Sequence, residues 1–232
     1  NITATATRFV GTQPTDTSEF SPCEVVPDFT VKSIEPVQVT QDANSSVPLV
    51  ANKRTVVRVF VNTAASSPIL DVNASLRGFL DGTELPGSPL VKSINGPITA
   101  PPTPQRSNIN DSINFLLPPE WTKVGKLKLE AEVKPPTTSM EVRTDNNKLP
   151  IERELVYRSL LMRYVRFTNS TGAIADFQRV KTADKLMRQL WPLSHLEYLA
   201  FDAFPRSIPA GSSANEVLGA MLSRNARRAD EL

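Results

Sequence analysis

The sequence predicts a mainly β protein, with an antiparallel β-sandwich over residues 28–158 and a smaller α/β segment over residues 159–232. Short β-branched runs alternate with turn residues along the first segment. Prolines outnumber glycines by 20 to 9, which fits proline-containing turns between strands. After residue 159 the apolar residues change to helical spacing. Residues 1–27 are rich in Thr, Ser and Pro, and we expect a flexible or extended N-terminal arm there.

The first strands of the sandwich are expected at residues 29–34 and 37–40. Residues 55–61 form the strongest strand candidate, because they are β-branched nearly throughout. The three odd-numbered valines of this run share one face. A strand that is apolar on both faces belongs in the middle of a sheet.

The next strand is expected at residues 72–80, closed by the turn Asp81-Gly82. Residues 85–105 are so rich in proline that they cannot form a central strand, and we expect a long surface connection. A strand resumes at residues 112–117.

Residues 127–133 alternate strictly and predict a strand that is apolar inside and charged outside. The turn Asp145-Asn146-Asn147 then precedes a closing strand at residues 151–157. About seven short strands separated by turns are typical of an immunoglobulin-like sandwich.

The α/β segment is predicted as β-α-β-α. Apolar strands at residues 160–167 and 196–201 flank a helix over residues 174–191, an order that implies parallel strands. A capping box, Ser213-Ala214-Asn215-Glu216, predicts the start of a second helix.

The run Val47–Val61 (VPLVANKRTVVRVFV) resembles the opening of CARDB (cell-adhesion-related) immunoglobulin-like modules in large secreted bacterial proteins. The resemblance extends to Asp145–Asn147, Leu161–Arg166 and Trp191–Ser194. It implies a non-catalytic module that is secreted or on the cell surface. In the family such a region often precedes a zincin-type peptidase domain that carries an HExxH motif.

The chain itself offers no set of catalytic or cofactor-binding residues. It has a single histidine, His195, whereas an HExxH helix needs two. His195 precedes a predicted strand, although ligand sites form at the carboxyl ends of strands. Asp176 fits a helix N-terminus, and Asp202 has no local carboxylate partner. There is no GxSxG, GxGxxG or P-loop sequence.

Calcium is the one metal that the sequence leaves open. Asp42 and Asn44, and again Asp145 and Asn147, place oxygen ligands on loops, as hard cations require. Neither pair has the EF-hand spacing, and turns rich in Asp and Asn are common without metal.

The composition restricts the partners of the chain. Lys and Arg number 26 against 24 Asp and Glu, so nothing indicates nucleic acid. No apolar stretch approaches the ~20 residues that span a bilayer. Cys23 is the only cysteine, which excludes an intrachain disulfide and leaves either an unreactive thiol or a bridge between chains. Five Asn-x-Ser/Thr sequons begin at Asn1, Asn44, Asn73, Asn110 and Asn169.

Three functions therefore remain open. The leading hypothesis is an extracellular structural, adhesion or assembly module that acts through protein–protein contacts or self-association. The second is the N-terminal part of a secreted zinc peptidase whose HExxH lies beyond Leu232, in which case the chain contacts a C-terminal domain. The third is a subunit of an extracellular filament that uses its N-terminal arm for strand exchange.

Overall fold

The computed structural model describes residues 4–18, 26–139, 141, 143–164, 167–168, 189–200, 206–207, 213 and 215–216. The chain divides into two compact units, Asn1–Val156 and Tyr157–Leu232. The first unit contains a β-sandwich, which confirms the predicted mainly β, immunoglobulin-like fold class.

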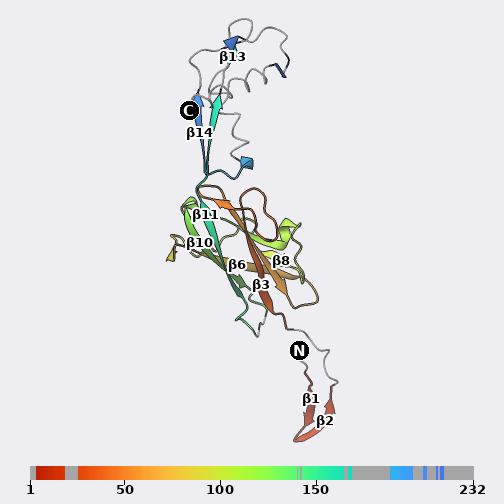
Figure 1. Ribbon diagram of the computed structural model, residues 1–232. Helices are drawn as coiled ribbons and strands as arrows, with labels where there is room; N and C mark the ends of the chain where they lie inside the picture. Colours follow the sequence, from red (N-terminus) through yellow and green to blue (C-terminus); the bar gives the residue numbers. More distant parts are fainter. Residues whose placement is uncertain are drawn as a thin grey trace. The chain divides into compact units, whose positions relative to one another are not determined.

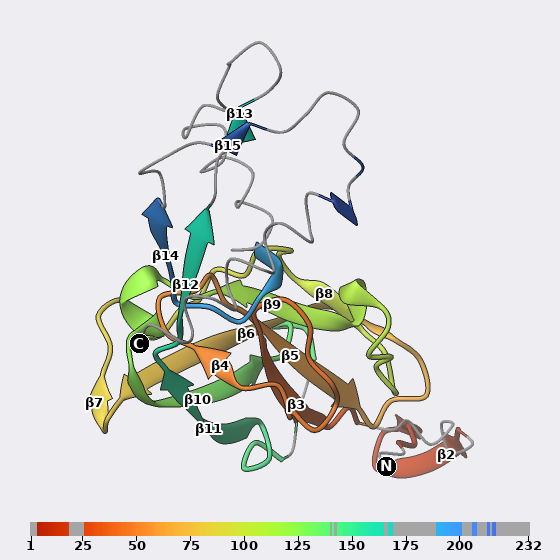
Figure 2. The ribbon, with the colours of Figure 1, turned by 45° about the horizontal axis from the view of Figure 1, so that its top comes forward.

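Two sheets make up the sandwich (Figures 1 and 2). One sheet has three antiparallel strands with β5 in the middle: β3 (Phe29–Val37), β5 (Val56–Thr63) and β9 (Ser112–Leu116). The other sheet runs in the order β4 (Leu49–Val50), β11 (Lys148–Val156), β10 (Gly125–Lys134), β6 (Ile69–Leu80) and β7 (Thr83–Glu84), and β8 (Ile98–Ala100) also pairs with β6. The strand over residues 55–61 is therefore central, as predicted.

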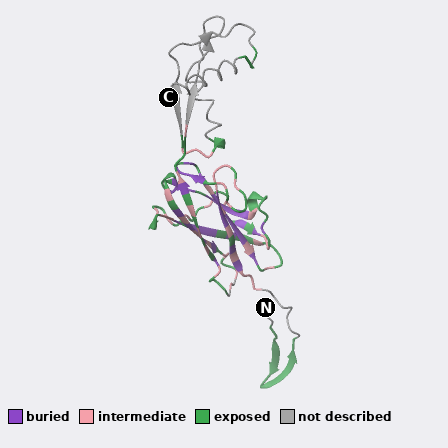
Figure 3. Ribbon diagram, viewed as in Figure 1, coloured by how far each residue is buried: buried purple, intermediate pink, exposed green. Residues whose placement is uncertain are grey.

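The core lies between the inner faces of the two sheets (Figure 3). Alternate residues of β5 and β10 point inward and are buried, including Val57, Val59, Leu127 and Leu129. Trp121, in the 3₁₀ turn η2 (Pro119–Thr122), is the largest fully buried side chain. The period-2 alternation predicted for residues 127–133 is confirmed.

The prediction of a separate strand at residues 37–40 is wrong. Strand β3 continues through Pro36 to Val37, with a bulge between Val31 and Ser33. The chain leaves this sheet after Val37, and the side chain of the next residue, Gln38, hydrogen-bonds to Val50 of β4 in the other sheet. Its amide donates to the Val50 carbonyl at 2.7 Å and accepts from the Val50 N–H at 2.9 Å.

The turn Asp81-Gly82 joins β6 to β7 as predicted, and both residues have positive φ, 48° and 84°. The proline-rich stretch after it is mostly a surface connection, but it is not free of strand. Strand β8 lies within it and pairs with β6, and Leu90 exchanges backbone hydrogen bonds with Leu76 at 2.8 and 2.9 Å. A second 3₁₀ turn, η1 (Ile109–Asp111), precedes β9.

The N-terminal region contains a hairpin that the sequence interpretation missed. Strands β1 (Thr7–Val10) and β2 (Gln13–Thr17) pair antiparallel, and every residue in both is exposed. Gly11 supplies the positive φ of 65° in the turn.

In the second unit, β12 (Ser159–Tyr164) and β14 (His195–Ala200) pair parallel, which confirms the predicted parallel arrangement. Strands β13 (Phe167–Thr168) and β15 (Arg206–Ser207) also pair parallel. The capping box is confirmed, because Ser213 N donates to Glu216 Oε2 at 2.7 Å and Glu216 N donates to Ser213 Oγ at 3.3 Å. Most of the predicted helix over residues 174–191 lies outside the described residues. Among those described, no helix is both long and apolar enough to cross a membrane.

Candidate functional site: a groove on the outer sheet face

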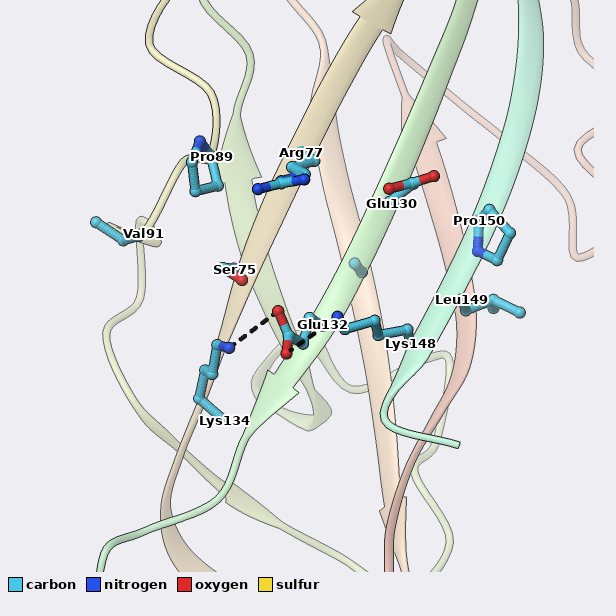
Figure 4. Close-up of a pocket in the computed structure, with 11 residues that line it drawn as sticks. Ser75, Arg77, Pro89, Val91, Glu130, Glu132, Lys134, Lys148, Leu149 and Pro150 are labelled. Carbon is cyan, nitrogen blue, oxygen red and sulfur yellow. Dashed lines mark ion pairs between the residues drawn. The ribbon is translucent and has the colours of Figure 1, made fainter. Parts of the chain in front are cut away.

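A groove of about 470 Å³ lies on the outer face of the larger sheet (Figure 4). Its floor is formed by residues of β6, β10 and β11 that point away from the core. The segment after β7 forms one wall with Pro89 and Val91, and β11 contributes Leu149 and Pro150. The groove therefore combines apolar walls with a charged floor.

Strand register places the charges of the floor. Glu130 lies opposite Arg77 on β6, and Glu132 lies opposite Lys148 on β11. Because side chains alternate across a strand, Glu130, Glu132 and Lys134 all point to this outer face. The groove thus carries both signs of charge within one small area.

Ion pairs order these charges. Glu132 contacts the Nζ of Lys134 at 2.9 Å and the Nζ of Lys148 at 3.6 Å (Figure 4). Burial opposes ionisation of Glu132, but the hydrogen bonds and charges of the two lysines outweigh it and lower the pKa of Glu132. Arg77 pairs with Glu84 at 3.6 Å across the β6–β7 turn. Glu132 is therefore ionised at neutral pH, and the ordered charges of the floor are suited to polar contacts.

The side wall provides the apolar part. Val91 is 73% exposed, one of the most exposed large apolar side chains among the described residues. Val91 lines the groove together with Pro89, Leu149 and Pro150, and the charges of the floor lie next to this apolar part. Protein-binding surfaces have a comparable arrangement, with an apolar centre and a polar rim.

The carboxylates predicted as calcium ligands, Asp42 and Asp145, have protein partners in the structure. The Asp42 carboxylate accepts hydrogen bonds from the N–H and the hydroxyl of Ser46, which lower the pKa of Asp42. Asn44 is exposed. Asp145 is paired with the Arg143 guanidinium at 2.9 and 3.1 Å, and only Asn147 of the four is buried. Calcium binding by the Asp42 and Asp145 loops stays a prediction.

The other predicted residues either do not line the groove or fall outside the described residues. His195 is the first residue of β14, opposite Ser159, and so at the amino end of its strand, as expected. Asp176, Asp202 and Cys23 lie outside the described part. Within that part, no group of three or more His, Cys, Asp and Glu side chains is arranged to hold a metal ion.

Sequence reasoning placed some of the groove's charges on the outer face but did not predict a groove. The alternation of residues 127–133 predicted the outward charges of β10. It missed Arg77, Val91 and Lys148, because these reach the groove only through strand register and a loop path that no local pattern reveals. The proline-rich stretch was the available signal that this loop lies at the surface.

Comparison with known proteins gives matches only among solved structures. No protein-family model matches the chain, and the search of curated proteins finds no match. The chain is similar to the crystal structure of the CARDB domain of the PF1109 protein from Pyrococcus furiosus in complex with di-metal ions, at 19% identity and a TM-score of 0.33. That match covers 58% of this chain and 98% of the domain.

The solution structure of the same Pyrococcus furiosus domain matches at 20% identity and a TM-score of 0.30, over 56% of this chain and 96% of the domain. Both matches are to a CARDB domain, the group that the sequence resembles. With identities and TM-scores this low, they carry no argument about ligands, partners or activity.

Proposed function

We propose that the chain is a non-catalytic extracellular module that works by binding protein, either a partner or a second copy, through the outer face of β6, β10 and β11. The groove carries this proposal, because it joins exposed Val91 to an ordered set of charges. Such a surface suits the recognition of an extended polypeptide segment. A secreted or cell-surface location is part of the same proposal.

Sedimentation of the purified full chain over a wide concentration range tests the proposal. Self-association that weakens at least tenfold in Val91→Glu would support it. Val124→Glu is the matched control, because Val124 is also exposed, at 55%, but does not line the groove. If the two substitutions weakened self-association equally, the groove would not be the binding surface.

A second proposal follows from the hairpin. Strands β1 and β2 are fully exposed, with Phe9 58% and Val10 62% exposed. A two-stranded hairpin is marginally stable in water by itself, so contact with a neighbouring subunit of a filament would stabilise it. Removal of residues 1–18 should then abolish assembly and leave the far-UV circular dichroism of the sandwich unchanged, whereas undiminished assembly would refute it.

The zinc peptidase hypothesis rests on the parallel strands β12 and β14, which form only a small sheet in the described residues. It requires an HExxH sequence downstream in the same reading frame. A reading frame without that motif would end this hypothesis.

A further inference from the structure

The end of the sandwich where β3 begins and β11 begins contains unpaired buried oxygen atoms. Within the described residues, four buried side-chain atoms have no hydrogen-bond partner, and three of them are amide oxygens. These are the Oδ1 atoms of Asn62, Asn146 and Asn147. Buried acceptors in folded proteins nearly always have a partner, so orphans such as these call for a bound ion or water.

Two carboxylates lie next to these amides. Both carboxylate oxygens of Asp28 accept from Asn146 Nδ2, at 3.2 and 3.1 Å. Glu141 Oε2 accepts from Asn147 Nδ2 at 2.7 Å, and its Oε1 accepts from the Phe29 N–H at 2.7 Å. The two heteroatoms of an amide share one carbon. The unpaired oxygens of Asn146 and Asn147 therefore each lie beside a carboxylate.

The strongest single observation is the unpaired amide oxygen of Asn147. It is only 5% exposed, and its Oδ1 has no partner although its Nδ2 is held by Glu141. A buried carbonyl oxygen in this position loses its hydration without compensation. A cation beside Glu141 would restore that compensation.

Asn62 brings the third orphan oxygen to the same place. It lies on β5 directly opposite Thr30 in the strand register, so the two side chains share a face. The Thr30 hydroxyl accepts from Asn146 Nδ2 at 3.2 Å. The oxygen-rich cluster thus extends from the 141–147 loop across the start of β3 to β5.

We propose that this end of the sandwich binds Ca²⁺ through Asp28, Glu141, Asn146 and Asn147. Carboxylates and amide carbonyl oxygens on loops are the ligands that calcium prefers, and calcium tolerates irregular geometry. The cluster contains no His or Cys, the residues that make up structural zinc sites. Without the ion the amide Nδ2 groups hold the carboxylates, and on binding the amides turn their oxygens toward the ion.

The local charge sets a weak affinity. Asp28 and Glu141 supply two negative charges, and the nearby Arg143 interacts electrostatically with Asp28. Asp145 is engaged by Arg143 and stays outside the site. We therefore expect a dissociation constant on the order of 10⁻⁴ to 10⁻³ M, as in other extracellular calcium modules.

Isothermal titration of the purified full chain with CaCl₂ tests this proposal directly. Saturable binding in that range is expected, together with a melting temperature that rises by a few degrees in excess CaCl₂ and less in MgCl₂ at equal ionic strength. No heat of binding and no melting shift would overturn the proposal, and ordered water would then satisfy the orphan oxygens.

Two variants locate the site. Asp28→Asn should weaken calcium binding at least tenfold, whereas Asp42→Asn, which alters the other acidic loop, should leave it unchanged. Asn147→Asp adds a carboxylate beside Glu141, so it should lower the melting temperature without calcium and enlarge the calcium-induced rise. The same calcium response in Asn147→Asp and in the unaltered chain would contradict the assignment even if Asp28→Asn failed to fold.

Discussion

At the scale of single residues, the packing of Trp121 depends on a glycine. The Trp121 indole N–H donates to the Pro86 carbonyl at 2.9 Å, and its ring lies against Gly78 on β6. A Cβ added at Gly78 would come within 2.3 Å of the ring. The largest buried side chain therefore fits only because position 78 has no side chain.

Gly78→Ala should lower the free energy of unfolding by about 1–3 kcal/mol, because an overpacked core must shift its side chains or backbone. Urea denaturation measures the change. In the double variant Gly78→Ala with Trp121→Phe, the smaller ring should relieve part of the clash, so the two effects should fall short of their sum. Strictly additive effects would show that the close contact is not the cause.

A second residue-scale feature is the ion pair between Glu35 and Arg106. The Glu35 side chain is 7% exposed, and the Arg106 Nε lies 3.0 Å from its Oε2. Arg106→Ala would leave a buried carboxylate without this hydrogen-bond donor and should cost about 1–3 kcal/mol in unfolding free energy.

Arg143→Ala is the control for Arg106→Ala. It breaks an ion pair with Asp145 in which both side chains are mostly exposed, and it should produce no measurable change in stability. If the two substitutions lowered the free energy of unfolding by similar amounts, burial of Glu35 would not be the reason for the effect of Arg106→Ala.

At the scale of elements, the outer face of β10 links stability to pH through Glu132. The pKa of Glu132 is lower in the folded chain than its usual value of 4.5. Its contribution to stability is therefore fully present above about pH 4.5 and is lost as the pH falls through the lower, folded-state pKa. Glu132→Gln should flatten this part of the stability profile in acid unfolding, and an unchanged profile would show that other carboxylates dominate.

The sequence predicts strands well where packing is locally regular. Residues 55–61 and 127–133 matched because their side chains follow one periodicity and meet one core. The end of β3 was mispredicted, since the hydrogen bonds of the Gln38 side chain to Val50 depend on a tertiary contact that no local pattern reveals. The clustering of Asp28 with Asn146 was missed for a similar reason, since it depends on contacts between residues distant in sequence.

At the scale of the whole molecule, a sandwich unit and a smaller unit with parallel strands follow each other along the chain. The sandwich presents its groove on the outer face of the larger sheet. We propose that this surface carries the function, and we assign no reaction to the described residues.

Sedimentation of the full chain and of Val91→Glu, with a parallel assay of casein hydrolysis, is the decisive test of self-association through the groove of a non-catalytic module. We expect association that Val91→Glu weakens and Val124→Glu does not, with no hydrolysis. A chain that stays monomeric at every concentration would contradict binding of a second copy through the groove, and a chain that cleaves casein would contradict a non-catalytic module.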